Sequence, residues 1–376
     1  MFLGWRLELP AADIDKAEDD YLSGNYTKCI ELAKAALKED KDREDWHILL
    51  SEALLATGKY PEALTAITNA LGNQSWRLRL RWQAHKVLKL NGETEAATEM
   101  LQGVYERASN QLRAYQDAPN LVVLAKAALM AGGDPKTILD KVLAMAKKSD
   151  PKLRDVYLAA GDLALEKHDY DLAAKKFQEG LKELPNDPDM NYGLAQAYEP
   201  SDPDLTMTAL DAAFKRNSNH VGCLLLLAEH HLDAENYTEA SKLLDRVEKV
   251  NPWNSDAWAY RAVLAHLQNQ PDQERAAREK ALKYWQDNPR VDYLIGHKLS
   301  QKYRFAEGAG HQRQALDFDS RYLPSKAQLA QDLLRLGEEA EGWKLAEEVQ
   351  KRRHRLRHYR PDQPRIHRHY HPCQLL

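Results

Sequence analysis

Residues 24–70 read GNYTKCIELAKAALKEDKDREDWHILLSEALLATGKYPEALTAITNA, and this stretch contains one pattern twice. A glycine, then a tyrosine two residues later, then a small residue three further on occurs at Gly24, Tyr26 and Cys29. The same order returns 34 residues later, beginning at Gly58, and a third glycine follows at Gly92 after another 34 residues. A fixed spacing of this kind indicates a structural repeat.

The C-terminal half has the same period independently of the turn glycines. Apolar residues 34 apart occur at Val247, Ala281, Ala315 and Val349. Within one period, apolar residues recur at spacings of three and four, as in 46–54, which is typical of an amphipathic helix. A glycine such as Gly58 can end the first helix in the left-handed conformation, and a proline such as Pro61 fits the first turn of the second. No sustained alternation predicts a β-strand.

A 34-residue helix pair with this order of small, aromatic and large residues resembles the tetratricopeptide repeat. The resemblance implies an all-α fold, a right-handed α-solenoid of about ten helix-turn-helix repeats. We expect an N-terminal extension at 1–9, the array at 10–350 and a basic, disordered tail at 351–376. Expected repeats are 10–43, 44–77, 78–111, 118–151, 154–187, 188–220, 221–254, 255–288, 289–322 and 323–350. The array should be irregular at 108–151 and 188–220.

The charge of the chain is unevenly distributed. Residues 351–376 hold eight Lys or Arg and one Asp, whereas residues 1–350 hold 45 basic and 56 acidic residues. The acidic body disfavours nucleic acid as a partner. Three widely spaced cysteines without a CxxC pair argue against a disulfide framework or a structural zinc site. With no expected signal peptide or transmembrane segment, a cytoplasmic location is the default expectation.

Motifs for catalysis are missing from the sequence. It has no HExxH, no phosphate-binding GxxxxGK[ST] loop and no GxSxG elbow. We therefore expect no enzyme activity, no cofactor, no metal and no small-molecule substrate. The expected function is a non-enzymatic scaffold that binds a protein or peptide on the concave face of the superhelix.

Two groups of residues are candidates for that contact, because the family places positions 2, 5, 9, 12 and 13 of each repeat in the groove. The first group is basic and aromatic: Arg79, Trp82, Lys86 and Lys89. The second comes from the last two repeats: Tyr293, His297, Gln301, Gln331 and Arg335. The simpler alternative is that Trp82 packs between repeats and that the lysines are merely solvated.

Residues 296–349, which begin GHKLSQKYRF, are similar to the repeat region of bacterial proteins in which an array precedes a gluzincin-type zinc peptidase domain. That resemblance implies an alternative function, the docking part of a truncated or frame-disrupted peptidase. No catalytic role can be transferred, because the chain has no HExxH.

The tail, KRRHRLRHYRPDQPRIHRHYHPCQLL, allows three interpretations. It could be a basic arm for nucleic acid or a membrane surface, a metal site at His367, His369, His371 and Cys373, or an out-of-frame translation. We favour the third, because Arg, His and Pro codons dominate when a GC-rich gene is read out of frame.

Overall fold

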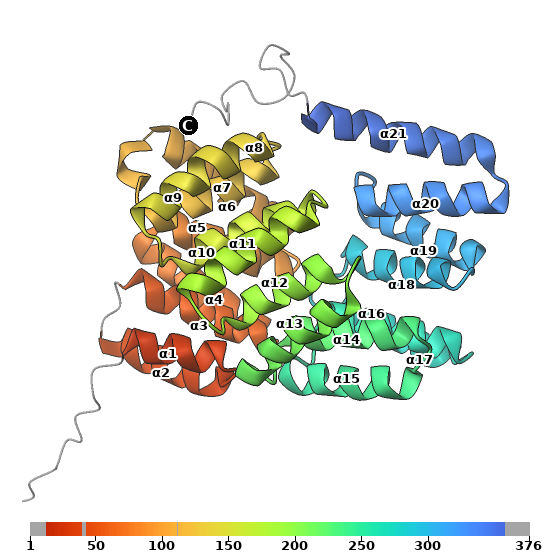
Figure 1. Ribbon diagram of the computed structural model, residues 1–376, viewed down its shortest axis with the longest axis horizontal. Coiled ribbons are helices and arrows are strands. Elements are labelled where there is room, and N and C mark those ends of the chain that lie inside the picture. The colour runs from red at the N-terminus through yellow and green to blue at the C-terminus, as the bar shows by residue number, and fades with distance from the viewer. Residues whose placement is uncertain (1–12, 40–42, 111, 358–376) are drawn as a thin grey trace, which may run out of the picture.

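The computed structural model of the protein describes residues 13–39, 43–110 and 112–357. Every regular element within these ranges is a helix, and the helices follow one another as antiparallel pairs (Figure 1). This arrangement confirms the predicted all-α solenoid. The expected extension at 1–9 and residues 358–376 of the expected tail lie outside the described residues. Residues 351–357, expected to be disordered, instead continue the last helix.

The helix pairs keep the order expected from the repeat. In the N-terminal half they are α1 (Ile14–Leu22) with α2 (Tyr26–Glu39), α3 (Glu44–Ala56) with α4 (Tyr60–Gln74), α5 (Leu78–Leu90) with α6 (Thr94–Asn110), and α10 (Arg154–Glu166) with α11 (Tyr170–Glu183). In the C-terminal half they are α12 (Pro188–Tyr198) with α13 (Pro203–Arg216), α14 (Val221–Asp233) with α15 (Tyr237–Val250), α16 (Ser255–Leu267) with α17 (Pro271–Ala281), α18 (Pro289–Gln301) with α19 (Phe305–Phe318), and α20 (Leu323–Leu336) with α21 (Glu339–Arg357).

The fourth pair departs from the regular form. A short 3-10 segment, η1 (Leu112–Tyr115), precedes its first helix, α7 (Ala118–Met130). Its second helix consists of α8 (Pro135–Thr137), a π-helical stretch η2 (Ile138–Leu143) and α9 (Ala144–Ser149). A π-helical stretch has more residues per turn than an α-helix, so it interrupts the regular winding of this second helix.

The turn between the helices of a pair has a left-handed residue in most repeats. Gly24, Gly58 and Gly92 have φ of +78°, +71° and +80°. Glycine adopts this conformation without the steric strain of a Cβ atom. In the sixth pair, Asp202 instead caps α13 by accepting a hydrogen bond from the N–H of Leu205. The predicted glycine turn and the predicted first-turn proline in α4 are both present.

The core is a continuous sequence of side chains between helices, and Phe177 shows how it is built. This fully buried ring of α11 lies against Gly161 of α10 and Gly193 of α12. A Cβ atom at either glycine would collide with the ring. The glycines therefore allow the first helices of two neighbouring repeats to approach one aromatic side chain.

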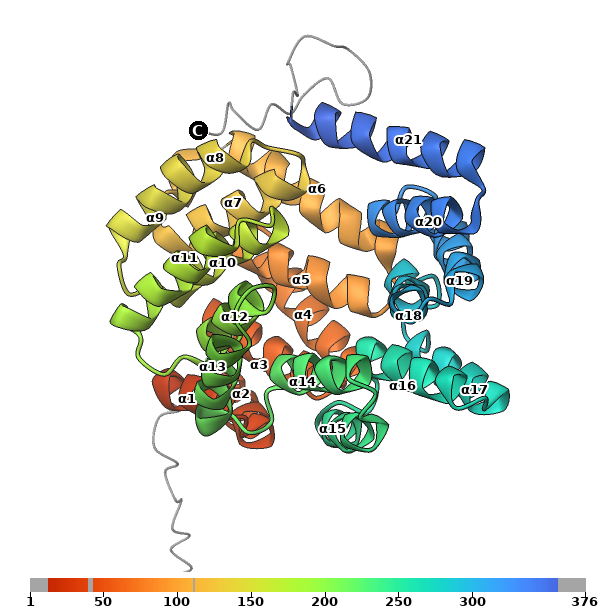
Figure 2. The same cartoon turned by 45° about the vertical axis from the view of Figure 1, so that its right-hand side comes forward.

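The stacked pairs curve until the chain returns beside its own start. Figure 2 shows the red N-terminal pairs lying beside the green helices α13 and α14. Hydrogen bonds join residues 191 positions apart across this boundary, such as Asn217 with Tyr26. The array therefore closes into one turn of a superhelix, in which the sixth and seventh repeats contact the first and second.

We predict that Phe177→Ala destabilises the protein by about 3–5 kcal/mol, because it removes a buried ring and leaves a cavity between three helices. Urea unfolding followed by circular dichroism measures the effect. Trp343→Ala is the control, since Trp343 is 60% exposed and its loss should change stability by less than about 0.5 kcal/mol. Equal unfolding midpoints for the two variants would contradict this account of the core.

Candidate functional site: the lumen of the superhelix

The first helices of the pairs form the inner wall of the superhelix, which we call the lumen. Contacts run in succession from α3 to α5, α5 to α7, α7 to α10 and α10 to α12, and again from α14 to α16 to α18 and α20. Because one helix of every repeat faces inward, residues at the same position of successive repeats line the lumen in rows.

A cavity of about 430 Å³ lies inside the lumen where the two edges of the turn meet. Its N-terminal wall is mainly aromatic and aliphatic and includes Tyr21, Leu55, Tyr60 and Leu90. These residues come from the ends of α1, α3 and α5 and from the start of α4. Its volume falls within the range of ligand-binding pockets in proteins.

The opposite wall of the cavity is polar and comes from the beginnings of α12, α14, α16 and α18. Asp189, His220, Asp256 and Arg290 lie there. Arg290 donates two hydrogen bonds of 2.9 Å to Asp256, which occupies the equivalent position one repeat earlier. The cavity therefore has one apolar side and one charged side.

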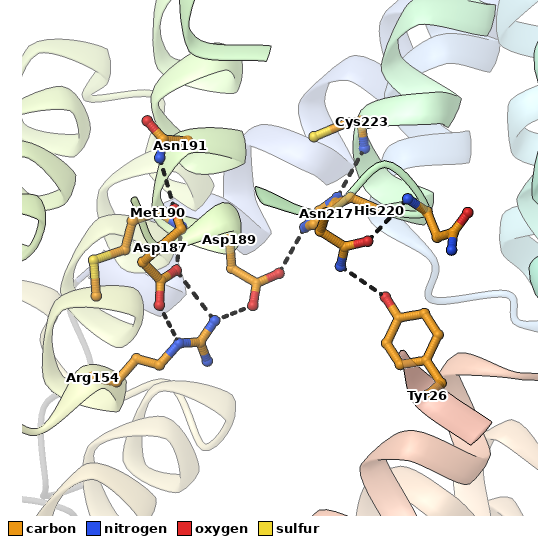
Figure 3. A network of polar contacts seen from close by, with 10 residues as sticks. Tyr26, Arg154, Asp187, Asp189, Met190, Asn191, Asn217, His220 and Cys223 are labelled. Atoms are coloured by element: carbon orange, nitrogen blue, oxygen red, sulfur yellow. Dashed lines mark hydrogen bonds and ion pairs between the residues drawn. The ribbon is translucent and has the colours of Figure 1, made fainter. Parts of the chain in front are cut away.

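Asp189 is the centre of a polar network on this wall (Figure 3). Its carboxylate pairs with Arg154, which also donates to Asp187 at a distance of 3.3 Å. His220 Nε2 lies 2.8 Å from Asp189 Oδ1. Although burial alone would raise it, the charge of Arg154 and the hydrogen bond from His220 hold the pKa of Asp189 well below its usual range.

The tautomer of His220 follows from its second contact. His220 is the N-cap residue of α14, and its Nδ1 accepts a hydrogen bond of 3.1 Å from the backbone N–H of Cys223. Nδ1 therefore carries no proton, and the ring proton is on Nε2, from which it donates to Asp189. His220 thus links the cap of one helix to the ion pair of its neighbour.

Three further carboxylates line the lumen without a direct ion pair. They are Glu18 on α1 and Asp155 and Asp162 on α10; all three reach solvent inside the lumen, but the surrounding helices partly desolvate them. Surrounding protein removes water from Asp162 and, with Asp189 and Asp155 nearby, raises its pKa to about 6. Desolvation also raises the pKa of Glu18, together with the charges of Asp15, Asp45 and Asp155. Asp155 differs, because burial alone would raise its pKa but the charges of Lys126, Arg154, Lys86 and Arg79 lower it. This part of the lumen therefore carries both signs of charge, and Glu18 and Asp162 are its least compensated carboxylates.

The first predicted group already has intramolecular partners. Arg79 pairs with Asp45 at 2.6 Å, and Lys86 pairs with Glu52. The Lys89 ammonium lies 5.3 Å from the centre of the Trp285 ring. Trp82 is partly buried and packs against the cluster that includes Leu78, Val104 and Val123, so it lies between repeats.

The second predicted group forms a more open surface on α18 and α20. Tyr293 stacks on His297 with ring centres 5.6 Å apart. The nitrogens of His297 are 2.8 Å from Gln328 Oε1 and 3.2 Å from Gln301 Nε2. Gln301, Gln331 and Arg335 are exposed. Tyr293, His297 and Gln301 are therefore in contact with one another on α18, and Gln331 and Arg335 are on α20, whereas the first group is on α5.

Sequence reasoning missed the residues of the cavity. Pairs such as Asp45 with Arg79 and Asp256 with Arg290 are separated by one 34-residue period and carry opposite charges. This 34-residue spacing of opposite charges was the sequence signal that could have identified the charged wall. The tyrosines of the opposite wall gave no comparable signal, because their role depends on contact between distant repeats.

The described residues also bear on metal binding and on insertion into a membrane. No group of three or more His, Cys, Asp or Glu side chains within them is arranged to hold a metal ion. No helix in the described ranges is long and apolar enough to cross a bilayer. The proposed tail ligands His367, His369, His371 and Cys373 lie outside the described residues.

Tetratricopeptide repeat models match residues 21–75, 158–206 and 199–267. The chain is a tetratricopeptide repeat protein. As such, it is a protein-interaction scaffold. No curated protein matches this sequence.

Among the solved structures similar to this tetratricopeptide repeat protein, one has a similar fold over most of the chain. The APC/C hetero-tetramer Cut9-Hcn1 has a TM-score of 0.53 and 12% identity, over 87% of this chain and 65% of that chain. Yeast Tom70 has a TM-score of 0.45 and 13% identity, over 90% and 83%. MamA has a TM-score of 0.32 and 19% identity, over 46% and 94%. None of these findings supports the expected link to a zinc peptidase.

We predict that Asp162→Asn makes the protein more stable than wild type at pH 7.5. The folded-state pKa of about 6 exceeds the ~3.9 of an unfolded aspartate. The folded wild-type protein therefore loses stability as the pH rises between these two pKa values. The gain should be at most about 1 kcal/mol, because solvent screens an accessible charge, and should vanish below about pH 4. Thermal unfolding across this range measures it.

The control for this titration is Asp211→Asn, on the exposed side of α13. As a substitution on the protein surface, it should change stability by less than about 0.5 kcal/mol. If Asp162→Asn is less stable than wild type at pH 7.5, the unfavourable charge assigned to Asp162 is wrong.

Proposed function

We propose that the protein binds an extended segment of another protein in the lumen of its superhelix, without catalysing a reaction. The observation that carries the proposal is the two-sided cavity. One wall offers Tyr21, Leu55 and Tyr60 to an apolar side chain, and the other offers charged groups such as Asp189 and Arg290 to polar groups of a peptide. A protein segment carries both kinds of group close together, so it matches both walls.

The same segment would continue from the cavity along neighbouring first helices. Toward the C-terminus it would meet the exposed Gln301, Gln331 and Arg335 beside the stacked Tyr293 and His297. On α5, a ligand would have to compete with the carboxylates that already pair with Arg79 and Lys86. We therefore propose the α18–α20 surface as the second contact, and assign Arg79, Trp82, Lys86 and Lys89 to shaping the lumen.

We predict that Ala56→Trp weakens peptide binding at least about tenfold, or about 1.4 kcal/mol. Ala56 lines the cavity at the end of α3, so an indole there would occupy the space available to a ligand. Short random peptides displayed on phage are first selected against the full-length protein. Fluorescence anisotropy then gives the dissociation constant of each selected peptide for wild type and variant.

The matched control introduces the same side chain elsewhere. Asn69→Trp places an indole on an exposed position of the outer helix α4 and should leave affinity unchanged. If the selected peptides bind Ala56→Trp as tightly as wild type, the cavity is not the binding site. If Asn69→Trp weakens binding equally, the effect is not specific to the lumen.

A further inference from the structure

We infer that the first repeats are latched onto the sixth and seventh by a repeating polar contact, which we call the seam. It comprises Gly24, Tyr26 and Asn217 at one level and Gly58, Tyr60 and Asn251 at the next. The seam holds one turn of the superhelix closed, and its release opens the lumen from the side. This inference goes beyond the proposed function, because it concerns how the lumen is reached and applies to any ligand.

The two levels of the seam have the same hydrogen bond. Asn217 Nδ2 donates to the Tyr26 hydroxyl at 3.1 Å, and Asn251 Nδ2 donates to the Tyr60 hydroxyl at 3.1 Å. Both asparagines are buried, with 2% and 4% of their surface exposed. A buried amide requires hydrogen-bond partners, so these contacts are needed for the asparagines to be buried there.

The turn glycines fit the seam for a reason beyond their backbone angle. A Cβ atom at Gly24 or Gly58 would collide with the side-chain oxygen of Asn217 or Asn251. Gly337 has a similar φ of +82°, yet a Cβ atom there would meet nothing within 4 Å. The corresponding turn of the ninth repeat carries Tyr303 at φ +63°. Larger residues are therefore tolerated where no second turn of the superhelix approaches.

The junctions between repeats show which side chain the seam selects. At four junctions, the residue three positions before the helix N-cap accepts the N–H two residues later with its side-chain oxygen: Asp150 at 3.0 Å, Asn217 at 3.0 Å, Asn251 at 3.1 Å and Asp319 at 2.8 Å. Aspartate and asparagine make this turn equally well. Only asparagine adds an amide donor, and of these four junctions the two that face the N-terminal turns carry it.

Flanking contacts extend the seam, among them the Lys89 ammonium over the Trp285 ring and the close approach of Gly92 to the Tyr284 carbonyl. Arg216 pairs with Asp19 at one end. At the other, the rings of Tyr60 and Tyr284 lie 5.2 Å apart in an edge-to-face arrangement. The seam is therefore mostly polar, unlike the apolar core that joins successive repeats. Small polar interfaces within one chain typically permit relative motion, so the seam can open while the repeats stay folded.

The seam borders the cavity, so opening the seam would change how a ligand enters the lumen. The cavity is lined by Tyr26 and Tyr60 from one edge and by Asn217 and Asn251 from the other. Opening the seam would separate the walls and create a lateral entrance. With the seam closed, a segment has to enter along the axis of the superhelix.

Distance measurement between spin labels tests the latch. Labels are placed at the exposed residues Lys59 and Lys249, on the two sides of the seam, in a full-length chain with Cys373→Ser. The native Cys29 and Cys223 are buried. Double electron–electron resonance should give one short distance in this labelled reference protein. Asn217→Ala with Asn251→Ala should lose much of this population to longer distances while keeping its helical circular dichroism.

The matched control is Asp150→Ala with Asp319→Ala, which removes the same turn hydrogen bond at two junctions outside the seam. It should keep the short distance. The latch is overturned if the asparagine variant retains the reference distribution, or if the aspartate variant opens as much. Should the asparagine variant lose its helices, Tyr26→Phe with Tyr60→Phe decides, with Tyr237→Phe at the equivalent position as control, and an unchanged distance would again overturn the latch.

Discussion

A 34-residue helix pair buries too little apolar surface to fold alone, so each pair in this protein depends on stacking against the next. Phe177, held between glycines of two neighbouring first helices, is one such contact. Each stacking step adds a small rotation, and the steps accumulate. After 191 residues the chain is again beside its start, where Asn217 meets Tyr26. The shape of the whole molecule thus follows from one repeated packing contact.

The same periodicity arranges the chemistry of the lumen. Because inward positions recur in every repeat, charges one period apart become neighbours, as in the pairs Asp45–Arg79 and Asp256–Arg290. Among the carboxylates without such a partner, Asp162 is one of the least compensated. The aromatic wall faces this polar row across the cavity. A binding surface with contrasting sides therefore follows from the stacking geometry.

The repeat itself could be predicted from sequence because its signal is local: Gly24, Gly58 and Gly92 mark turns whose conformation depends on adjacent residues. The closure of the superhelix could not, since it depends on the rotation at each stacking step, which a period of 34 does not determine. The basic group on α5 was a candidate contact for a ligand, and the sequence did not show that Lys86 pairs with Glu52 of the preceding repeat. The spacing of Asn217 and Asn251 was a signal, but its meaning required knowing which turn approaches them.

Amide hydrogen exchange of the free, unmodified protein tests most directly whether the superhelix is closed. The turns at Gly24 and Gly58 lie in the seam, whereas the turn at Gly337 has the same left-handed glycine but no facing repeat. A closed superhelix predicts slower exchange for the amides of residues 24–26 and 58–60 than for residues 337–339. Equally fast exchange in all three turns would contradict the closure and the cavity that depends on it.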